Sequence, residues 1–204
     1  VLIQAEFSGI SGGTEMLAYR GELDSSLPRD ETLGALAGSF EYPFTYGYSV
    51  IGTVEASRSD VAEGERVFAF HPHQTRIVVS AADVVRIGAC DPRTATLFPL
   101  VETALQISLD AGVRYREVTA VLGLGPVGIL TAVLLTRSGA TVLGSDLKPW
   151  RRETAKVCGL EAVERRPERD GRQEEAVRGV EGRHLGVLLT GLVVLVERGV
   201  EVAD

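Results

Sequence analysis

Three glycines at the spacing G-x-G-x-x-G directly follow an apolar run that predicts a buried strand over residues 118–122. Gly123 permits a sharp turn at the end of this strand, and Gly125 has no Cβ, so a phosphate can approach the backbone there. Gly128 allows the next helix to pack closely against the strand. The first N–H groups of that helix lack intrahelical partners and lie at the positive end of its dipole. The pattern therefore predicts a pyrophosphate site.

The elements after the glycines place an acidic residue where a dinucleotide needs one. A predicted helix and a second strand over residues 141–145 lead to Asp146, 18 residues after Gly128. A carboxylate near this spacing hydrogen-bonds ribose hydroxyls and repels a 2′-phosphate, which favours NAD(H) over NADP(H). Three basic residues shortly after it keep NADP(H) open as the alternative. The predicted cofactor-binding residues are Gly123, Leu124, Gly125, Pro126, Val127, Gly128, Asp146 and Arg151.

The composition is that of a globular chain. With 204 residues, the sequence can form one large or two small domains. A net charge of −7 argues against nucleic acid or an anionic membrane surface as a partner. No apolar run reaches the roughly 20 residues of a membrane span, and no secretory signal opens the chain. Its two cysteines, Cys90 and Cys158, form no C-x-x-C pair, so a reducing, cytoplasmic location is expected.

The remaining elements are predicted from apolar periodicity and turn residues. Short strands over residues 1–7, 49–56, 66–70, 76–79 and 84–87 favour a small barrel. Residues 92–112 predict a helix or a helix pair, and residues 150–160 predict another helix. The charged stretch 164–172 predicts a solvated loop. The apolar stretch 185–196 is compatible with strands or with a short helix.

Several of these segments together resemble the medium-chain dehydrogenase/reductase superfamily. The segment SGISGGTE at 8–15 is similar to its S-G-(I/V)-C-G-T-D motif. Pro43, Gly47 and Gly52 follow its P-x-x-x-G-H-E and G-x-V pattern, and GERV at 64–67 is similar to G-D-R-V. The resemblance implies an α/β fold in which a GroES-like β-barrel domain precedes a partial Rossmann domain. It places the catalytic domain at 1–95, a bridging helix at 96–117 and the dinucleotide domain at 118–204.

The chain departs from the family at the positions that hold the catalytic zinc. Ser11 stands near the cysteine ligand, Tyr48 stands in place of the histidine, and Ser49 replaces the acid after it. Hydroxyl and phenol groups are not usual zinc ligands, so we expect no metal. In these departures the chain resembles the zinc-lacking branch of the superfamily that includes bacteriochlorophyllide a dehydrogenase. The chain is also shorter than full members, which predicts a truncated relative.

Without zinc, a side chain must polarise the substrate oxygen and move its proton. The predicted catalytic residues are Thr14, Tyr48, Ser11 and His71, with His73 as an equal alternative to His71. For each of these residues a structural role is the alternative: turn capping for Thr14, core packing for Tyr48 and a strand-end position for the histidines. The aromatic stretch 40–48 suggests an apolar, large substrate.

The resemblance thus implies an NAD(H)-dependent, zinc-independent oxidoreductase that interconverts an alcohol and a carbonyl. Two alternatives stay open: a quinone- or enoyl-type reductase of double bonds, and a non-catalytic relative that only binds a dinucleotide. Pairing into a homodimer through the edge of the dinucleotide-domain sheet is also implied.

Overall fold

The computed structural model describes residues 1–29, 34–163 and 193–197, the last as backbone only. The chain divides into two compact units, Val1–Pro99 and Leu100–Asp204, and the boundary falls in the first turn of a helix. The charged stretch 164–172, predicted as a loop, lies outside the described residues. Within the described residues, no helix is both long and apolar enough to span a bilayer.

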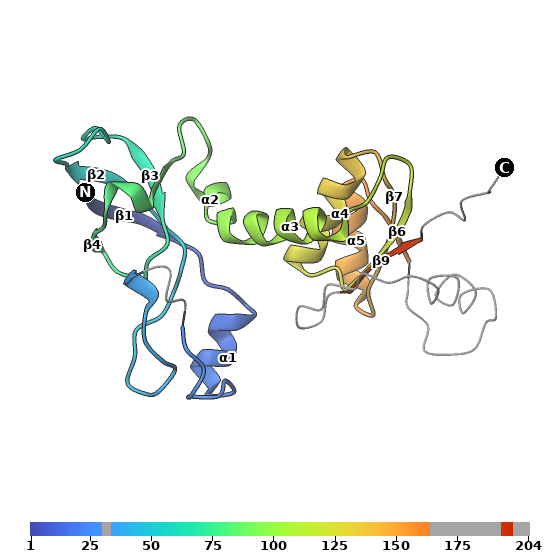
Figure 1. Ribbon diagram of the computed structural model, residues 1–204, viewed down its shortest axis with the longest axis horizontal. Coiled ribbons are helices and arrows are strands. Elements are labelled where there is room, and N and C mark those ends of the chain that lie inside the picture. The colour runs from blue at the N-terminus through green and yellow to red at the C-terminus, as the bar shows by residue number, and fades with distance from the viewer. Residues whose placement is uncertain (30–33, 164–192, 198–204) are drawn as a thin grey trace. The chain divides into compact units, whose positions relative to one another are not determined.

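The first unit is built on a five-stranded antiparallel sheet (Figure 1). Along the sheet the strands follow the order β4-β1-β2-β3-β5. Apolar side chains that alternate along β1, β2 and β3 form its core, because successive residues of a strand face opposite sides. The strands are β1 (Leu2–Ser8), β2 (Val50–Ala56), β3 (Arg66–Ala69), β4 (Arg76–Val78) and β5 (Val84–Arg86).

The predicted mixed α/β class is confirmed, whereas the predicted barrel is not seen in the described part of the chain. The sheet ends at β4 on one side and at β5 on the other. Each of these strands has only three residues, which leaves little backbone for a ladder that would close the sheet. All five strands lie where alternation of apolar residues predicts them, with ends that differ by one or two residues.

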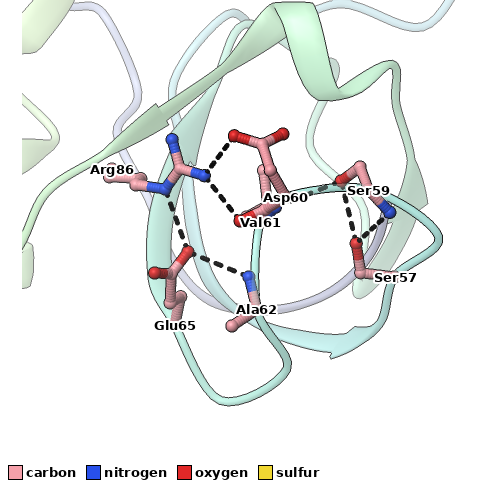
Figure 2. Close-up of polar contacts among 7 residues, drawn as sticks. All are labelled: Ser57, Ser59, Asp60, Val61, Ala62, Glu65 and Arg86. Carbon is pink, nitrogen blue, oxygen red and sulfur yellow. Dashed lines mark hydrogen bonds and ion pairs between the residues drawn. The ribbon is translucent and has the colours of Figure 1, made fainter.

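An ion-pair network fixes the loop between β2 and β3 (Figure 2). Arg86 of β5 donates to Asp60 Oδ2 at 2.8 Å and to Glu65 Oε2 at 3.1 Å. The Ala62 N–H also donates to Glu65 Oε2, at 3.1 Å. The guanidinium lowers the pKa of the Asp60 carboxyl through a hydrogen bond and its charge. These groups are solvated and lie away from the predicted site residues, so we assign them a local structural role.

Short helices accompany the sheet of the first unit. Helix α1 (Thr14–Arg20) ends at Gly21 in the left-handed conformation, φ 69°. The 3₁₀ turns are η1 (Gly34–Leu36) and η2 (Ala81–Asp83). The predicted helix pair at 92–112 is present as α2 (Pro92–Ala95) and α3 (Phe98–Ala111). The Asp91 carboxylate caps α2 by accepting from the Thr94 N–H at 2.9 Å, as its position before the helix predicts.

The second unit contains a four-stranded sheet in the order β8-β7-β6-β9 (Figure 1). Strands β6, β7 and β8 are parallel, and β9 pairs antiparallel with β6. Ile107 of α3, Val121 of β6 and Leu135 of α4 belong to its buried core. The elements are β6 (Val118–Leu122), α4 (Pro126–Arg137), β7 (Thr141–Ser145), α5 (Pro149–Val157), β8 (Glu161–Val163) and β9 (Val193–Glu197).

Candidate functional site

The three glycines form a tight turn between β6 and α4. Gly123 has φ 102°, a conformation that side chains rarely adopt, and its N–H donates to the Ser145 carbonyl at 2.8 Å. Gly125 caps α4, and Pro126 is the first helical residue. Proline suits this position because its missing N–H would have no intrahelical partner. The sequence therefore predicts both the turn and the start of the helix correctly.

The surface above Gly125 is open to a ligand. A Cβ built at Gly125 meets no atom within 4 Å, and the residue has an ordinary φ of −71°. Gly128 is buried within α4, where it faces the packed side of the helix. The backbone N–H groups of Val127 and Gly128 lie in the first helical turn, which directs unpaired donors and a partial positive charge outwards. These residues therefore fit the pyrophosphate of a dinucleotide.

Asp146 is bound by the protein on both carboxylate oxygens. Its Oδ2 accepts from the Leu124 N–H at 2.8 Å and from Arg151 Nη1 at 3.2 Å, and its Oδ1 accepts from the Lys148 N–H at 2.8 Å. The residue is 7% exposed. A carboxylate has about four acceptor positions, so these three donors leave room for about one ligand hydroxyl. Asp146 thus links the glycine turn to α5.

Burial raises the pKa of the Asp146 carboxyl, but the N–H donors of Lys148 and Leu124 and the Arg151 guanidinium outweigh this effect. The net result is a pKa below the ordinary value. A carboxyl group whose pKa is lower in the folded than in the unfolded state stabilises the fold at pH values above its unfolded-state pKa. That stabilisation is lost as the pH falls through the folded-state value.

We expect Asp146→Asn to lower the free energy of unfolding by about 1–3 kcal/mol at pH 7, because a buried donor loses its anionic acceptor. Urea unfolding between pH 3 and pH 7 checks this. The difference between wild type and variant should shrink as the pH falls below the ordinary aspartate range, because the wild-type carboxylate is then protonated. A difference that stays constant with pH would contradict the proposed role of the charge.

Arg151 adds a positive charge beside Asp146. Besides its bond to Asp146, its guanidinium lies 5.2 Å from the centre of the Trp150 ring. Its Nε is buried and has no hydrogen-bond partner among the residues that the structure describes. Leu124, also predicted to bind the cofactor, uses its N–H for Asp146, and its side chain is 1% exposed in the core. The structure therefore brings the predicted cofactor residues together, with Leu124 in a supporting position.

Three of the four predicted catalytic residues meet in the first unit. Burial and the Glu15 carboxylate raise the pKa of the Tyr48 phenol above its ordinary value, and they outweigh the hydroxyls of Ser11 and Thr14, which lie near the phenol and lower its pKa. A phenol is protonated at neutral pH and can donate a hydrogen bond to an oxygen. Ser49, which follows it, is 2% exposed and donates to the Thr96 carbonyl at 2.8 Å.

The fourth predicted residue, His71, does not join this cluster. Its Nδ1 hydrogen-bonds to the Pro72 carbonyl at 3.0 Å, which turns the ring towards its own backbone. The alternative, His73, contacts two residues of the 8–15 segment instead. Its Nε2 lies 2.6 Å from Glu15 Oε2, and its Nδ1 bonds to the Ser8 hydroxyl. Sequence reasoning singled out neither Glu15 nor Ser8. Both residues lie within the 8–15 segment, and Glu15 directly follows Thr14. The motif in this segment was therefore the sequence signal that could have identified them.

A chain of aromatic rings leads to Tyr48. Phe40, Phe44, Tyr46 and Tyr48 follow one another with ring centroids 5.1–6.4 Å apart, mostly edge to face. The predicted aromatic stretch therefore forms a series of ring contacts that ends at Tyr48. Such a series of rings favours an apolar ligand.

No family model matches the sequence. The chain is 25% identical over 182 residues to the D-guloside 3-dehydrogenase of Escherichia coli K12, an alignment that covers 79% of this chain and 51% of the enzyme. Among solved structures, the 2R,3R-butanediol dehydrogenase of Bacillus subtilis is similar, with a TM-score of 0.68 and 22% identity over 87% of this chain and 59% of that chain. The chain has the fold of the medium-chain dehydrogenase/reductase superfamily.

A second solved structure of this fold, a short chain alcohol dehydrogenase of Escherichia coli CFT073, is complexed with NADH. It has a TM-score of 0.66 and 19% identity over 88% of this chain and 59% of that chain. The chain therefore spans about half the length of the curated relatives it matches, and just under three fifths of these two solved structures. The expected resemblance to medium-chain dehydrogenases and reductases is confirmed.

The donor set in the first unit does not fit a catalytic zinc. At the positions that the resemblance assigns to zinc ligands, the structure has the hydroxyl of Ser11 and the phenol of Tyr48. Zinc in proteins takes cysteine, histidine or carboxylate ligands. The described residues contain no group of three or more such side chains able to hold a metal ion.

Proposed function

We propose that this chain carries the dinucleotide-binding and proton-donating parts of an NAD(H)-dependent, zinc-independent oxidoreductase that interconverts an alcohol and a carbonyl. The observation that carries this proposal is the glycine turn, in which the open surface above Gly125, the start of α4 and Asp146 are arranged for a dinucleotide. The similarity to dehydrogenases, one of them complexed with NADH, supports it.

The second unit would hold the cofactor, which supplies or accepts a hydride when bound. The N–H groups of Val127 and Gly128 bind the pyrophosphate, and the remaining acceptor position of Asp146 takes a ribose hydroxyl. Arg151 stays on the Asp146 carboxylate and limits its repulsion of a 2′-phosphate. NAD(H) remains the preferred cofactor because the carboxylate directly faces the ribose position.

Tyr48 supplies the proton in the first unit. Its phenol is protonated at neutral pH, as tyrosine ordinarily is, and burial raises its pKa further, so it can donate a hydrogen bond to the carbonyl oxygen of the substrate. The hydroxyls of Ser11 and Thr14 lie near this phenol. The adjacent aromatic rings favour a substrate with an apolar body. This arrangement polarises the oxygen without a metal.

Titration of the purified chain with NADH and NADPH tests the cofactor assignment. We expect NADH to bind more tightly, and NADH at about 100 times its Kd to raise the free energy of unfolding by about 2–3 kcal/mol. Stabilisation by neither nucleotide would contradict the proposal. NADH oxidation with apolar aldehydes then tests the reaction. Activity with enones in place of aldehydes would assign double-bond reduction, and binding without turnover would assign a purely dinucleotide-binding protein.

A further inference from the structure

A hydroxyl, an imidazole and a carboxylate contact one another in sequence at the end of β1. The Ser8 hydroxyl bonds to His73 Nδ1, and His73 Nε2 lies 2.6 Å from Glu15 Oε2. Ser8 is the last residue of β1, Glu15 lies in the first turn of α1, and His73 lies in the segment after β3. All three belong to the first unit. Side chains of these types in this order can activate a serine as a nucleophile.

The carboxylate determines which nitrogen of His73 can accept a proton. An ionised carboxylate only accepts hydrogen bonds, so Nε2 carries the hydrogen that is donated to Glu15. In the neutral ring Nδ1 then has a free lone pair, and Nδ1 is the nitrogen that contacts the Ser8 hydroxyl. The Ser49 carbonyl, 3.1 Å from Ser8 Oγ, is a second acceptor for the same hydrogen. Of these two acceptors, only the imidazole can remove the proton.

The imidazole ring is held in place by its surroundings. Glu15 is 8% exposed, and its Oε1 accepts from the Ser11 N–H at 2.9 Å, which fixes the carboxylate. Gly47 has φ 129°, and a Cβ at this position would lie 2.6 Å from His73 Nε2. The His73 N–H donates to the Tyr46 carbonyl at 3.4 Å. The ring therefore lies against a glycine on one side and a fixed carboxylate at one nitrogen, which leaves its other nitrogen for the hydroxyl.

The hydroxyl at the end of this series is open to solvent. Ser8 is exposed and the His73 side chain is 29% exposed, so a substrate can reach both. The negative charge of Glu15 beside the ring disfavours an anionic substrate. Ile10, two residues after Ser8, is 72% exposed and adds an apolar side chain to this stretch of the surface. These features favour an uncharged substrate with an apolar group.

We propose that Ser8 is a nucleophile for acyl transfer, with His73 as its general base and Glu15 as a positioning residue, and that the first unit cleaves uncharged carboxylic esters. Ser8 Oγ forms a bond to the ester carbonyl carbon while its proton passes to His73 Nδ1. The bond from that carbon to the alcohol oxygen breaks, and His73 returns the proton to the leaving alcohol. Water then gives a proton to His73 and its oxygen to the acyl group, which leaves Ser8 as a carboxylic acid. The reaction needs no cofactor and does not rest on the proposed dinucleotide function.

Hydrolysis of p-nitrophenyl butyrate and labelling with a fluorophosphonate test the nucleophile and its base. We expect one phosphonyl adduct, located on Ser8 by peptide mapping, and a hydrolysis rate that falls about 100-fold or more in Ser8→Ala and in His73→Gln. The amide of His73→Gln can still bond to Glu15 but cannot accept the proton. His71→Gln is the matched control, because that ring bonds to the Pro72 carbonyl. An adduct elsewhere, no adduct, or an equal loss of rate in His71→Gln overturns the proposal.

The variant Glu15→Gln tests the positioning role. We expect kcat for ester hydrolysis to fall about 10-fold or more while KM stays unchanged, because the amide no longer fixes the hydrogen on Nε2 of His73 or stabilises the imidazolium. Glu63→Gln, which removes an exposed charge of the same unit, should behave as wild type. A change in KM alone, or unchanged kinetics, would show that Glu15 does not act through the ring.

The variant Ser8→Cys gives a measurement that needs no ester turnover and carries its own reference. Cys90 and Cys158 are free and exposed in the same chain. A thiol paired with an imidazole ionises more readily, so the introduced thiol should react with iodoacetamide at pH 7 about 10-fold faster than these two cysteines. Addition of His73→Gln should abolish this difference. Equal rates for all three thiols overturn the proposal. NADH takes no part in these assays, so a failure of the proposed function leaves their outcome unchanged.

Discussion

Replacement of Tyr48 by phenylalanine is expected to lower kcat by about 100-fold or more, in line with the loss of one acid or hydrogen-bond donor to a reacting oxygen. The ring contact with Tyr46, with centroids 6.0 Å apart, stays in place, so the fold should be retained. Only the hydroxyl near Ser11 and Thr14 is removed. Steady-state reduction of an apolar aldehyde by NADH measures the effect.

Binding of NADH by Tyr48→Phe should equal that of wild type, because the glycine turn lies in the other unit of the chain. Tyr19→Phe is the matched control, since Tyr19 is 81% exposed and removal of its hydroxyl should leave kcat unchanged. A Tyr48→Phe variant with wild-type kcat would show that another group polarises the substrate oxygen.

Replacement of Gly125 by valine is expected to raise the Kd for NADH about 100-fold or more, while the free energy of unfolding falls by only about 1 kcal/mol because valine is a poor N-cap residue. The residue has φ −71°, and a Cβ there meets no protein atom, so the fold accommodates the side chain. The same side chain occupies the space where the pyrophosphate approaches the N–H groups of α4. Loss of two hydrogen bonds to a charged group, each about 1.5–3 kcal/mol, accounts for a change of this size.

Isothermal titration with NADH and urea unfolding of the same samples test this result together. Gly34→Val serves as a control, because a Cβ at Gly34 also meets nothing within 4 Å and the residue lies in the first unit. A variant at Gly125 that binds NADH with wild-type affinity would place the dinucleotide elsewhere.

The cofactor turn could be predicted almost completely because each of its features has a local cause. Gly123 needs a positive φ, Pro126 starts a helix without an N–H, and Asp146 ends the next strand. All three signals lie within 24 residues of one another and require no knowledge of distant contacts. The number of protein donors on Asp146 was not predictable, because the positions of the Leu124 N–H and of Arg151 depend on how the turn and α5 pack.

The hydroxyl cluster could be predicted only in part. The spacing of the 8–15 segment brought Ser11 and Thr14 into consideration, and they do meet Tyr48. The choice between His71 and His73 depended on which ring packs against Gly47. That contact joins Gly47 and His73, which are 26 positions apart in the sequence. The direction of β9 also escaped prediction, because an apolar run indicates a buried strand without indicating which way it runs.

The direction of β9 distinguishes the two sides of the described sheet in the second unit. The described elements β6-α4-β7-α5-β8 form one βαβαβ half of a Rossmann fold, of the kind that binds a single mononucleotide. On the other side of β6, the antiparallel β9 stands where a parallel strand would begin the second half. The described half contains the glycine turn and Asp146. We therefore expect it to bind the adenosine diphosphate portion that nicotinamide and flavin dinucleotides share.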